Sequence, residues 1–152
     1  MAYPNVFQPE ETERLITRIE QLTPATQPQW GKMNVAQMLA HCCVPYELAL
    51  TDQHPKPSPL KRWLMRNFVK GMVVSEKPFP KNSPTAKEFL VPEQQDFEQQ
   101  KERLIGFLRQ VQTLGKQTFE GRDYPNFGRL TASEWSNLMY KHLNHHLEQF
   151  GV

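Results

Sequence analysis

The stretch from Leu130 to Val152 reads LTASEWSNLMYKHLNHHLEQFGV and contains three of the five histidines in the chain. Thr131 and Glu134 have the spacing of a capping box, in which a hydroxyl and a carboxylate each satisfy a backbone N–H that the first turn leaves unpaired. Gly151 is a typical residue to end a helix. The stretch therefore predicts one amphipathic helix that begins at Ala132 and ends at Gly151.

The histidines of this helix differ in the face on which they lie. At about 100° per residue, His142 and His146 fall within about 20° of the centre of the apolar face marked by Trp135, whereas His145 lies about 80° away. Two imidazoles four residues apart on one face can reach the same cation. Alternatively, both are ordinary buried core residues. A metal site would also need a third ligand from elsewhere in the chain.

The length and the charge of the chain limit its class. At 152 residues it is long enough for one domain with its own core, so we expect a single domain over residues 1–152. Its net charge of +2 gives no dense basic surface, and we expect no nucleic-acid partner. The N-terminus does not resemble a signal peptide, and no apolar run approaches the roughly 18 residues of a membrane span. We therefore expect a cytoplasmic protein with no stable membrane association.

The two cysteines, Cys42 and Cys43, are neighbours in the sequence. Adjacent helical residues cannot easily bring their sulfur atoms to disulfide geometry, which fits a reducing compartment. We interpret both as small buried hydrophobic residues, with a redox or ligand role as the alternative.

Three other stretches repeat apolar residues at helical spacing. They are residues 9–23, residues 35–50 and a stretch from Pro92 to Gly115. No stretch is typical of a strand. Together with the C-terminal helix they predict an all-α four-helix bundle. The connection of roughly 40 residues between the second and third helices is too long for a tight hairpin, so we expect a long crossover that contains a short extra helix.

The second of these helices is apolar nearly all round, so we expect it to be the most buried, and it contains His41. A buried imidazole needs a hydrogen-bond partner or a metal. Pro45 cannot donate to the carbonyl of His41, so we expect a kink there. The kink either orients the His41 side chain or is only a consequence of core packing.

The crossover contains three different kinds of sequence. Residues 51–59 form a proline-rich loop in which we expect His54 to be solvated. Residues 60–74 have a narrow apolar stripe beside basic residues, which predicts a short helix that packs by its stripe with its charges in solvent. A membrane-surface helix is the less favoured interpretation. Residues 75–91 contain three prolines and predict irregular structure.

Three motifs together resemble the DinB/YfiT-like superfamily, and more narrowly its uncharacterised branch. They are Trp30 to Met33 followed by Met38 to His41, then Phe127 to Trp135, and then Tyr140 to Gly151. The resemblance covers nearly the whole chain. It implies a metal-binding four-helix bundle in which His41, His142 and His146 hold a divalent metal, most often zinc or nickel, and it implies a homodimer. Relatives often have a histidine before the Phe-Gly pair, and Tyr124 stands at that place here.

The resemblance also implies a class of activity. Some members of the superfamily look like metal-dependent transferases that use a low-molecular-weight thiol, and a divalent cation can stabilise a bound thiolate at neutral pH. A metal-dependent hydrolase of a small-molecule substrate is the close variant. The alternative is a non-catalytic dimeric module, for stress response or interaction, whose metal is structural. No residue is assigned a catalytic role, and Glu148, Glu47 and Gln37 are candidates to orient the histidines.

Overall fold

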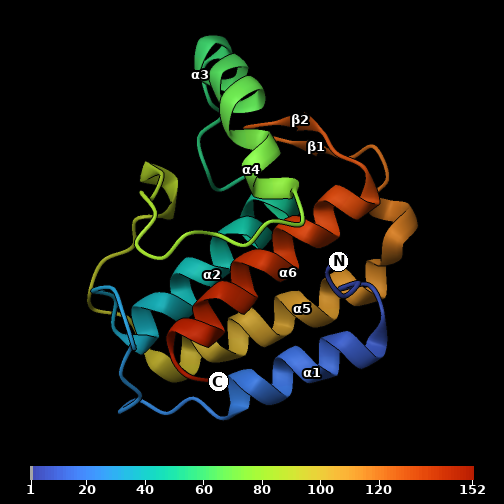
Figure 1. Cartoon of the computed structure of the whole chain (residues 1–152). Coiled ribbons are helices and arrows are strands. Elements are labelled where there is room, and N and C mark those ends of the chain that lie inside the picture. The colour runs from blue at the N-terminus through green and yellow to red at the C-terminus, as the bar shows by residue number, and fades with distance from the viewer. Residues whose placement is uncertain (1) are drawn as a thin grey trace.

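The computed structural model describes residues 2–152 and is mostly helical, with one small two-stranded sheet (Figure 1). Its long helices lie alongside one another. They are α1 (Pro9–Glu20), α2 (Val35–Leu50), α5 (Phe97–Phe119) and α6 (Ala132–Gln149). Helix α5 packs against α1, α2 and α6, and α6 also packs against α1 and α2. The predicted predominance of helix is confirmed.

Local capping fixes where α2 and α6 begin. At α6, the Thr131 hydroxyl accepts the Glu134 N–H at 3.2 Å, and the Glu134 carboxylate accepts the Thr131 N–H at 2.9 Å. At α2, Asn34 and Gln37 form the same reciprocal pair. Such a cap contributes about 1 kcal/mol. Both predicted helix starts are confirmed.

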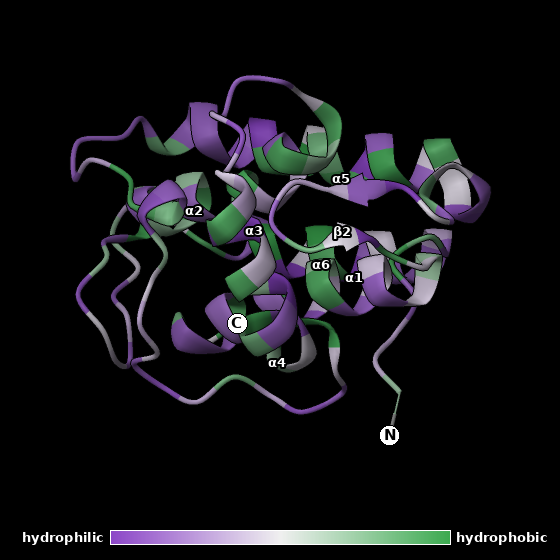
Figure 2. Ribbon diagram, turned by 90° about the horizontal axis from the view of Figure 1, so that it is seen from above, coloured by the Kyte–Doolittle hydropathy of each residue, from purple (hydrophilic) through white to green (hydrophobic). Residues whose placement is uncertain are grey.

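The core lies between the long helices, and α2 is the most buried of them. Only its Gln37 and Leu50 are more than marginally exposed. Cys42 and Cys43 are free and fully buried, as their interpretation as small hydrophobes requires. The helix continues through Pro45 without an interruption. In Figure 2, green apolar and purple hydrophilic bands alternate along the other long helices, as expected where one face packs and the other meets solvent.

The bounds of helices α5 and α1 differ from the prediction. Helix α5 begins at Phe97 and not at Pro92, because the Asp96 side chain accepts the Gln99 N–H at 2.8 Å and caps the helix there. Gly115 does leave the helical conformation, with φ of 73°, but helical turns resume and reach Phe119. Helix α1 ends at Glu20, three residues before the predicted end.

The sheet was not predicted. Strands β1 (Asp123–Tyr124) and β2 (Gly128–Arg129) pair antiparallel, with Tyr124 opposite Gly128. Each strand has two residues, too few for an alternating pattern to appear in the sequence. The pair shapes the turn before α6, and it buries Tyr124 against the Trp135 ring at a centroid distance of 5.3 Å.

The crossover contains a helical arm that projects away from the long helices (Figure 1). We define the arm as residues 59–74, which comprise α3 (Pro59–Leu64), the π-helical turn η1 (Met65–Val69) and α4 (Lys70–Val74). Helix was predicted here, but the predicted burial of its apolar stripe was wrong. The exposed fractions are 68% for Leu60, 56% for Trp63 and 73% for Phe68. Three of its four basic residues are instead paired with acids, namely Lys61 with Glu88, Arg62 with Asp123 and Lys70 with Glu134.

The rest of the crossover is irregular apart from the 3-10 turn η2 (Lys87–Phe89), as predicted. It is tied to α6 by Lys141, whose ammonium donates to the carbonyls of Met72, Ser75 and Lys77. Lys141 is only 1% exposed. These bonds therefore fix the position of the crossover along α6.

The expectation of a solvated His54 was wrong. Its Nε2 lies 2.6 Å from a carboxylate oxygen of the buried Glu47, and Arg103 binds the other oxygen of that carboxylate. His54 and Arg103 therefore both donate to the buried Glu47 carboxylate and stabilise it.

Among residues 2–152, no helix is both long and apolar enough to cross a membrane.

Candidate metal centre

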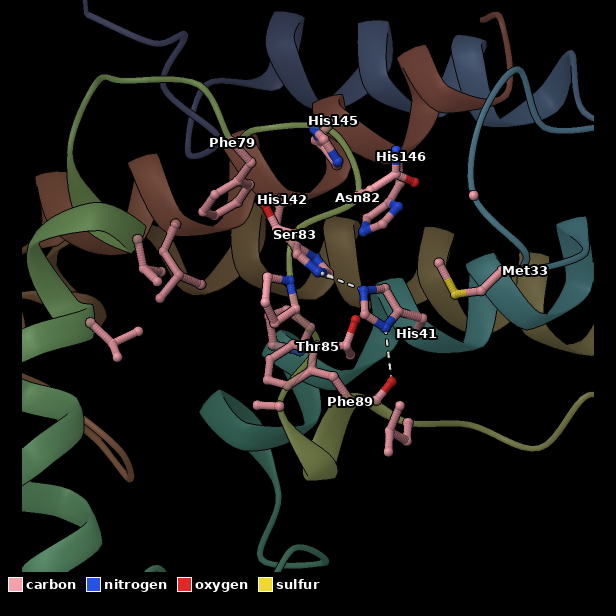
Figure 3. Close-up of a pocket in the computed structure, with 18 of the residues that line it drawn as sticks. Met33, His41, Phe79, Asn82, Ser83, Thr85, Phe89, His142, His145 and His146 are labelled. Atoms are coloured by element: carbon pink, nitrogen blue, oxygen red, sulfur yellow. Dashed lines mark hydrogen bonds between the residues drawn. The ribbon is translucent and has the colours of Figure 1, made fainter.

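Three histidines from two helices meet in the structure. His41 comes from α2, and His142 and His146 come from successive turns of α6. Their ring centroids are 4.6 to 4.9 Å apart, and one nitrogen from each ring lies within 4.8 Å of the other two. Figure 3 shows the His41 and His142 rings joined by a hydrogen bond, with His146 beside them. The phase of α6 thus brings His142 and His146 to the face that meets His41, and His145 is not part of this group.

Hydrogen bonds to Nδ1 hold the rings of His41 and His146. His41 Nδ1 lies 2.8 Å from the Phe89 carbonyl oxygen, and His146 Nδ1 lies 2.8 Å from the Gln149 amide oxygen. Both oxygens can only accept, so each Nδ1 carries the proton and each Nε2 keeps a free lone pair. His142 Nε2 lies 2.9 Å from His41 Nε2 and must therefore donate to it. Two lone pairs and one exchangeable N–H converge on the same point.

Burial keeps these imidazoles neutral. It lowers the pKa of His41, although the hydrogen bond to the Phe89 carbonyl opposes the shift. Burial also lowers the pKa of His146 to about 3. Burial first, and then the neighbouring His41 and His146, hold the pKa of His142 well below its usual value. Neutral imidazole is the form that binds a metal ion.

The arrangement fits a divalent metal ion. A four-coordinate ion at about 2.0–2.1 Å from each nitrogen separates its ligand atoms by roughly 3.4 Å. The His142–His41 pair would open slightly from 2.9 Å, and the widest pair in the group would close from 4.8 Å. The hydrogen bonds to Nδ1 of His41 and His146 are of the kind that orients metal-bound histidines.

The partners that orient the histidines were not found in the sequence. None of Glu148, Glu47 and Gln37 bonds to a ring nitrogen of the trio; the partners are the Gln149 amide and the Phe89 carbonyl. Gln149 did leave a signal, because it is a polar residue on the apolar face of α6. A backbone carbonyl from the distant crossover leaves no such signal.

Gln149 also links the centre to the loop before α2. Its amide nitrogen donates to the Trp30 carbonyl at 2.7 Å, while its oxygen accepts from His146. The next residue, Gly31, has φ of 82°, and a Cβ there would lie 2.4 Å from the same amide nitrogen. Glycine is required for this close approach. The conformation of the Trp30–Gly31 turn therefore fixes the position of the amide that orients His146.

The three histidines open onto a cavity of about 570 Å³. It lies between α6, the arm and the irregular part of the crossover, and Figure 3 shows Asn82, Ser83 and Thr85 near the histidines. This volume is in the range of small-molecule sites. Tyr124 also lines the cavity, and burial raises its pKa. The histidines are thus reachable by a ligand and are not sealed in the core.

Comparison with known proteins places the chain in a family. A family model described as "Protein of unknown function (DUF1569)" matches residues 4–151, so the chain belongs to the DUF1569 family. No curated protein and no solved structure matches the chain.

Proposed function

We propose that this DUF1569 chain is a metal-binding protein of the DinB/YfiT-like type. In this proposal α1, α2, α5 and α6 form a four-helix bundle in which residues 51–96 are the long crossover. His41, His142 and His146 hold one divalent ion, with zinc and nickel as the first candidates because imidazole suits both. The observation that carries the proposal is the convergence of three neutral imidazoles at the end of an accessible cavity.

We further propose that the site is catalytic. Three protein ligands leave at least one position of the ion open, which is typical of catalytic zinc sites and not of closed structural ones. A bound divalent ion lowers the pKa of a coordinated thiol or water, which suits a transferase that uses a low-molecular-weight thiol, or a hydrolase.

The residues around the trio have separate tasks in this proposal. Gln149 and the Phe89 carbonyl hold His146 and His41 in one tautomer and orientation. The His142 Nε2 proton, which now bonds to His41, must leave or move to Nδ1 before His142 can act as a ligand. The protein's own thiols take no part, since burial raises the pKa of Cys43 to about 12 and keeps Cys42 protonated too.

Metal analysis tests the site. The purified protein is loaded with zinc or nickel, dialysed and measured beside His41→Ala and His145→Ala. His145 is a matched control because it lines the same cavity but is outside the trio. We expect about one ion per chain in the parent and in His145→Ala and little in His41→Ala. Equal metal in all three proteins, or none in any, would overturn the assignment.

Activity distinguishes catalysis from a structural metal. Metal-loaded protein is assayed for transfer of small thiols to an electrophile and for hydrolysis of small esters, with His142→Ala as the comparison. A structural role predicts that His142→Ala unfolds the protein and that no activity is found in the parent. The cavity beside the trio favours the catalytic role, because a structural ion needs no space for a ligand.

We also propose that the arm mediates a homodimer. Leu60, Trp63, Leu64, Phe68 and Met72 are 44% to 73% exposed. Two such faces would bury roughly 1,000–1,200 Å² in total, which reaches the lower limit of a specific interface. Lys61, Arg62 and Lys70 are already paired with Glu88, Asp123 and Glu134, so of the four basic residues of the arm only Arg66 would be available to an anionic membrane.

Light scattering tests the dimer. We expect a mass of two chains for the parent and one chain for Phe68→Glu. A parent protein that is monomeric at high micromolar concentration would refute the dimer. Sedimentation of such a monomer with anionic vesicles would favour the membrane instead.

A further inference from the structure

The walls of the cavity change in character from one end to the other. The histidine end carries the polar side chains of Asn82, Ser83 and Thr85. The arm contributes Met65, Val69 and Val73, which line the cavity and pack against the core. A ligand in this cavity therefore meets polar groups at the metal end and aliphatic groups toward the arm.

The lining residues carry little charge. The described residues that line the cavity include no Asp or Glu, and Lys32 is the only Lys or Arg among them. A cationic group of a ligand buried there would have no acidic side chain to pair with. A ligand with several carboxylates would have too few basic side chains to bind them all. The cavity therefore excludes the charged body of a peptide-like thiol and accepts a neutral or singly anionic ligand.

The aliphatic wall extends along a single short piece of the arm. Val69 and Val73 lie four residues apart, one turn along the helical arm, and both line the cavity, while Leu138 of α6 lines it as well. A straight chain or an aromatic ring would contact several of these side chains at once. Each methylene removed from water at such a wall strengthens binding by about three- to fourfold.

We infer that the cavity binds an amphiphile with one small head group at the histidine end and an apolar body directed toward the arm. Hydroxamates, thiols and carboxylates with alkyl or aryl tails are the chemical class. The head-group part of this inference rests on the proposed metal site. The apolar-body part rests on the cavity walls alone.

A chain-length comparison tests both parts. Zinc-loaded protein is titrated by calorimetry with acetohydroxamate and with octanohydroxamate, which share a head group and differ by six methylenes. Metal-free protein is titrated with 1-octanol while the methionine methyl signals are followed by NMR. We expect octanohydroxamate to bind at least about 100-fold more tightly than acetohydroxamate, and 1-octanol to shift the Met65 methyl signal.

Matched variants locate the effect. Val69→Asn places an amide in the aliphatic wall and is expected to remove most of the chain-length gain. Leu114→Asn makes the same kind of change at an exposed residue of α5 that does not line the cavity, and is expected to leave the gain intact. If Val69→Asn does not fold, the nearly isosteric Val73→Thr takes its place, with a smaller loss of the same gain expected.

The outcomes separate the two proposals. Equal affinities for the two hydroxamates, in a protein that binds zinc, would overturn the inference and leave the metal site standing. If the protein binds no metal, the proposed function fails and 1-octanol alone decides: a shift of Met65 that Val69→Asn weakens supports the apolar site, and the absence of any shift overturns it.

Discussion

Replacing Lys141 by methionine should cost more stability than any surface lysine of this chain. Its ammonium donates to the carbonyls of Met72, Ser75 and Lys77 at 2.5, 2.9 and 2.8 Å. The side chain is 1% exposed, so these three carbonyls and not water are the partners of the ammonium in the folded state. Methionine has a similar length and keeps the packing of the aliphatic stem, which isolates the role of the ammonium.

The magnitude follows from two opposing terms. A hydrogen bond to a charged group contributes about 1.5–3 kcal/mol, and burying an ammonium costs several kcal/mol. Removing the ammonium leaves its carbonyl partners without this donor, and each buried carbonyl left unpaired costs about 1–3 kcal/mol. We expect Lys141→Met to lower the free energy of unfolding by about 3 kcal/mol, which lowers Tm by about 6–12 °C in a chain of this size.

Urea unfolding followed by circular dichroism measures the change, with Lys70→Met as the control. Lys70 pairs with Glu134 at 2.9 Å, but both side chains are about a quarter exposed, so its loss should cost less than about 1 kcal/mol. Proteolysis should also become faster at residues 75–91, because Lys141 ties that segment to α6. If Lys141→Met is as stable as Lys70→Met, the three carbonyl contacts do not hold the crossover.

The pH dependence of the free energy of unfolding gives a second comparison of the parent with Lys141→Met. Burial lowers the pKa of Lys141 from 10.5 to about 8 in the folded state. Between these values the unfolded chain binds more protons than the folded one, so this lysine makes stability rise with pH across that window. The parent should therefore gain stability relative to Lys141→Met between pH 8 and 10.5, while the other titrating groups cancel in the difference. A constant difference across that range would contradict the lowered pKa.

Three further substitutions test how the centre and its helix are held. Gln149→Leu removes the acceptor for His146 Nδ1 and should weaken metal binding by about 10- to 100-fold in a chelator competition, and an unchanged affinity would show that this amide does not orient His146. Gly31→Ala should cost about 1–3 kcal/mol in thermal unfolding because of its φ of 82° and its contact with Gln149, whereas Gly106→Ala, where a Cβ meets open space within a helix, should be neutral or stabilising. Thr131→Ala should cost about 1 kcal/mol through loss of the α6 capping box, and Thr131→Ser should restore most of it.

The local features of this protein could be predicted from its sequence. Thr131 and Glu134 set the start of α6 because both partners of the capping box are three residues apart. The 100° step per residue placed His142 and His146 on the buried face and His145 on its flank. These features depend on contacts between residues within one or two helical turns, and the spacing of residues in the sequence predicts such contacts directly.

Longer-range features needed the tertiary structure. His41 bonds to His142 across 101 residues of sequence, and periodicity within α2 gave no reason to choose it; only the resemblance did. The Phe89 carbonyl that orients His41 belongs to the irregular crossover, where backbone groups carry no sequence signature. His54 was expected in solvent because its loop is proline-rich. Its imidazole instead binds the carboxylate of Glu47, which lies near the C-terminal end of α2.

The arm shows the physical reason most clearly. Its periodicity predicted a helix with an apolar stripe, and that helix exists. The pattern predicted that the stripe with Leu60 and Phe68 would pack, but these residues are exposed, and the apolar residues Val69 and Val73 pack against the core instead. The packing of the arm over the cavity decided it, since only one side of a projecting helix can face the α6 histidines. Spacing within the chain thus determined the helices and two of the candidate ligands, and the third ligand, the cavity and the exposed face followed from how those helices pack.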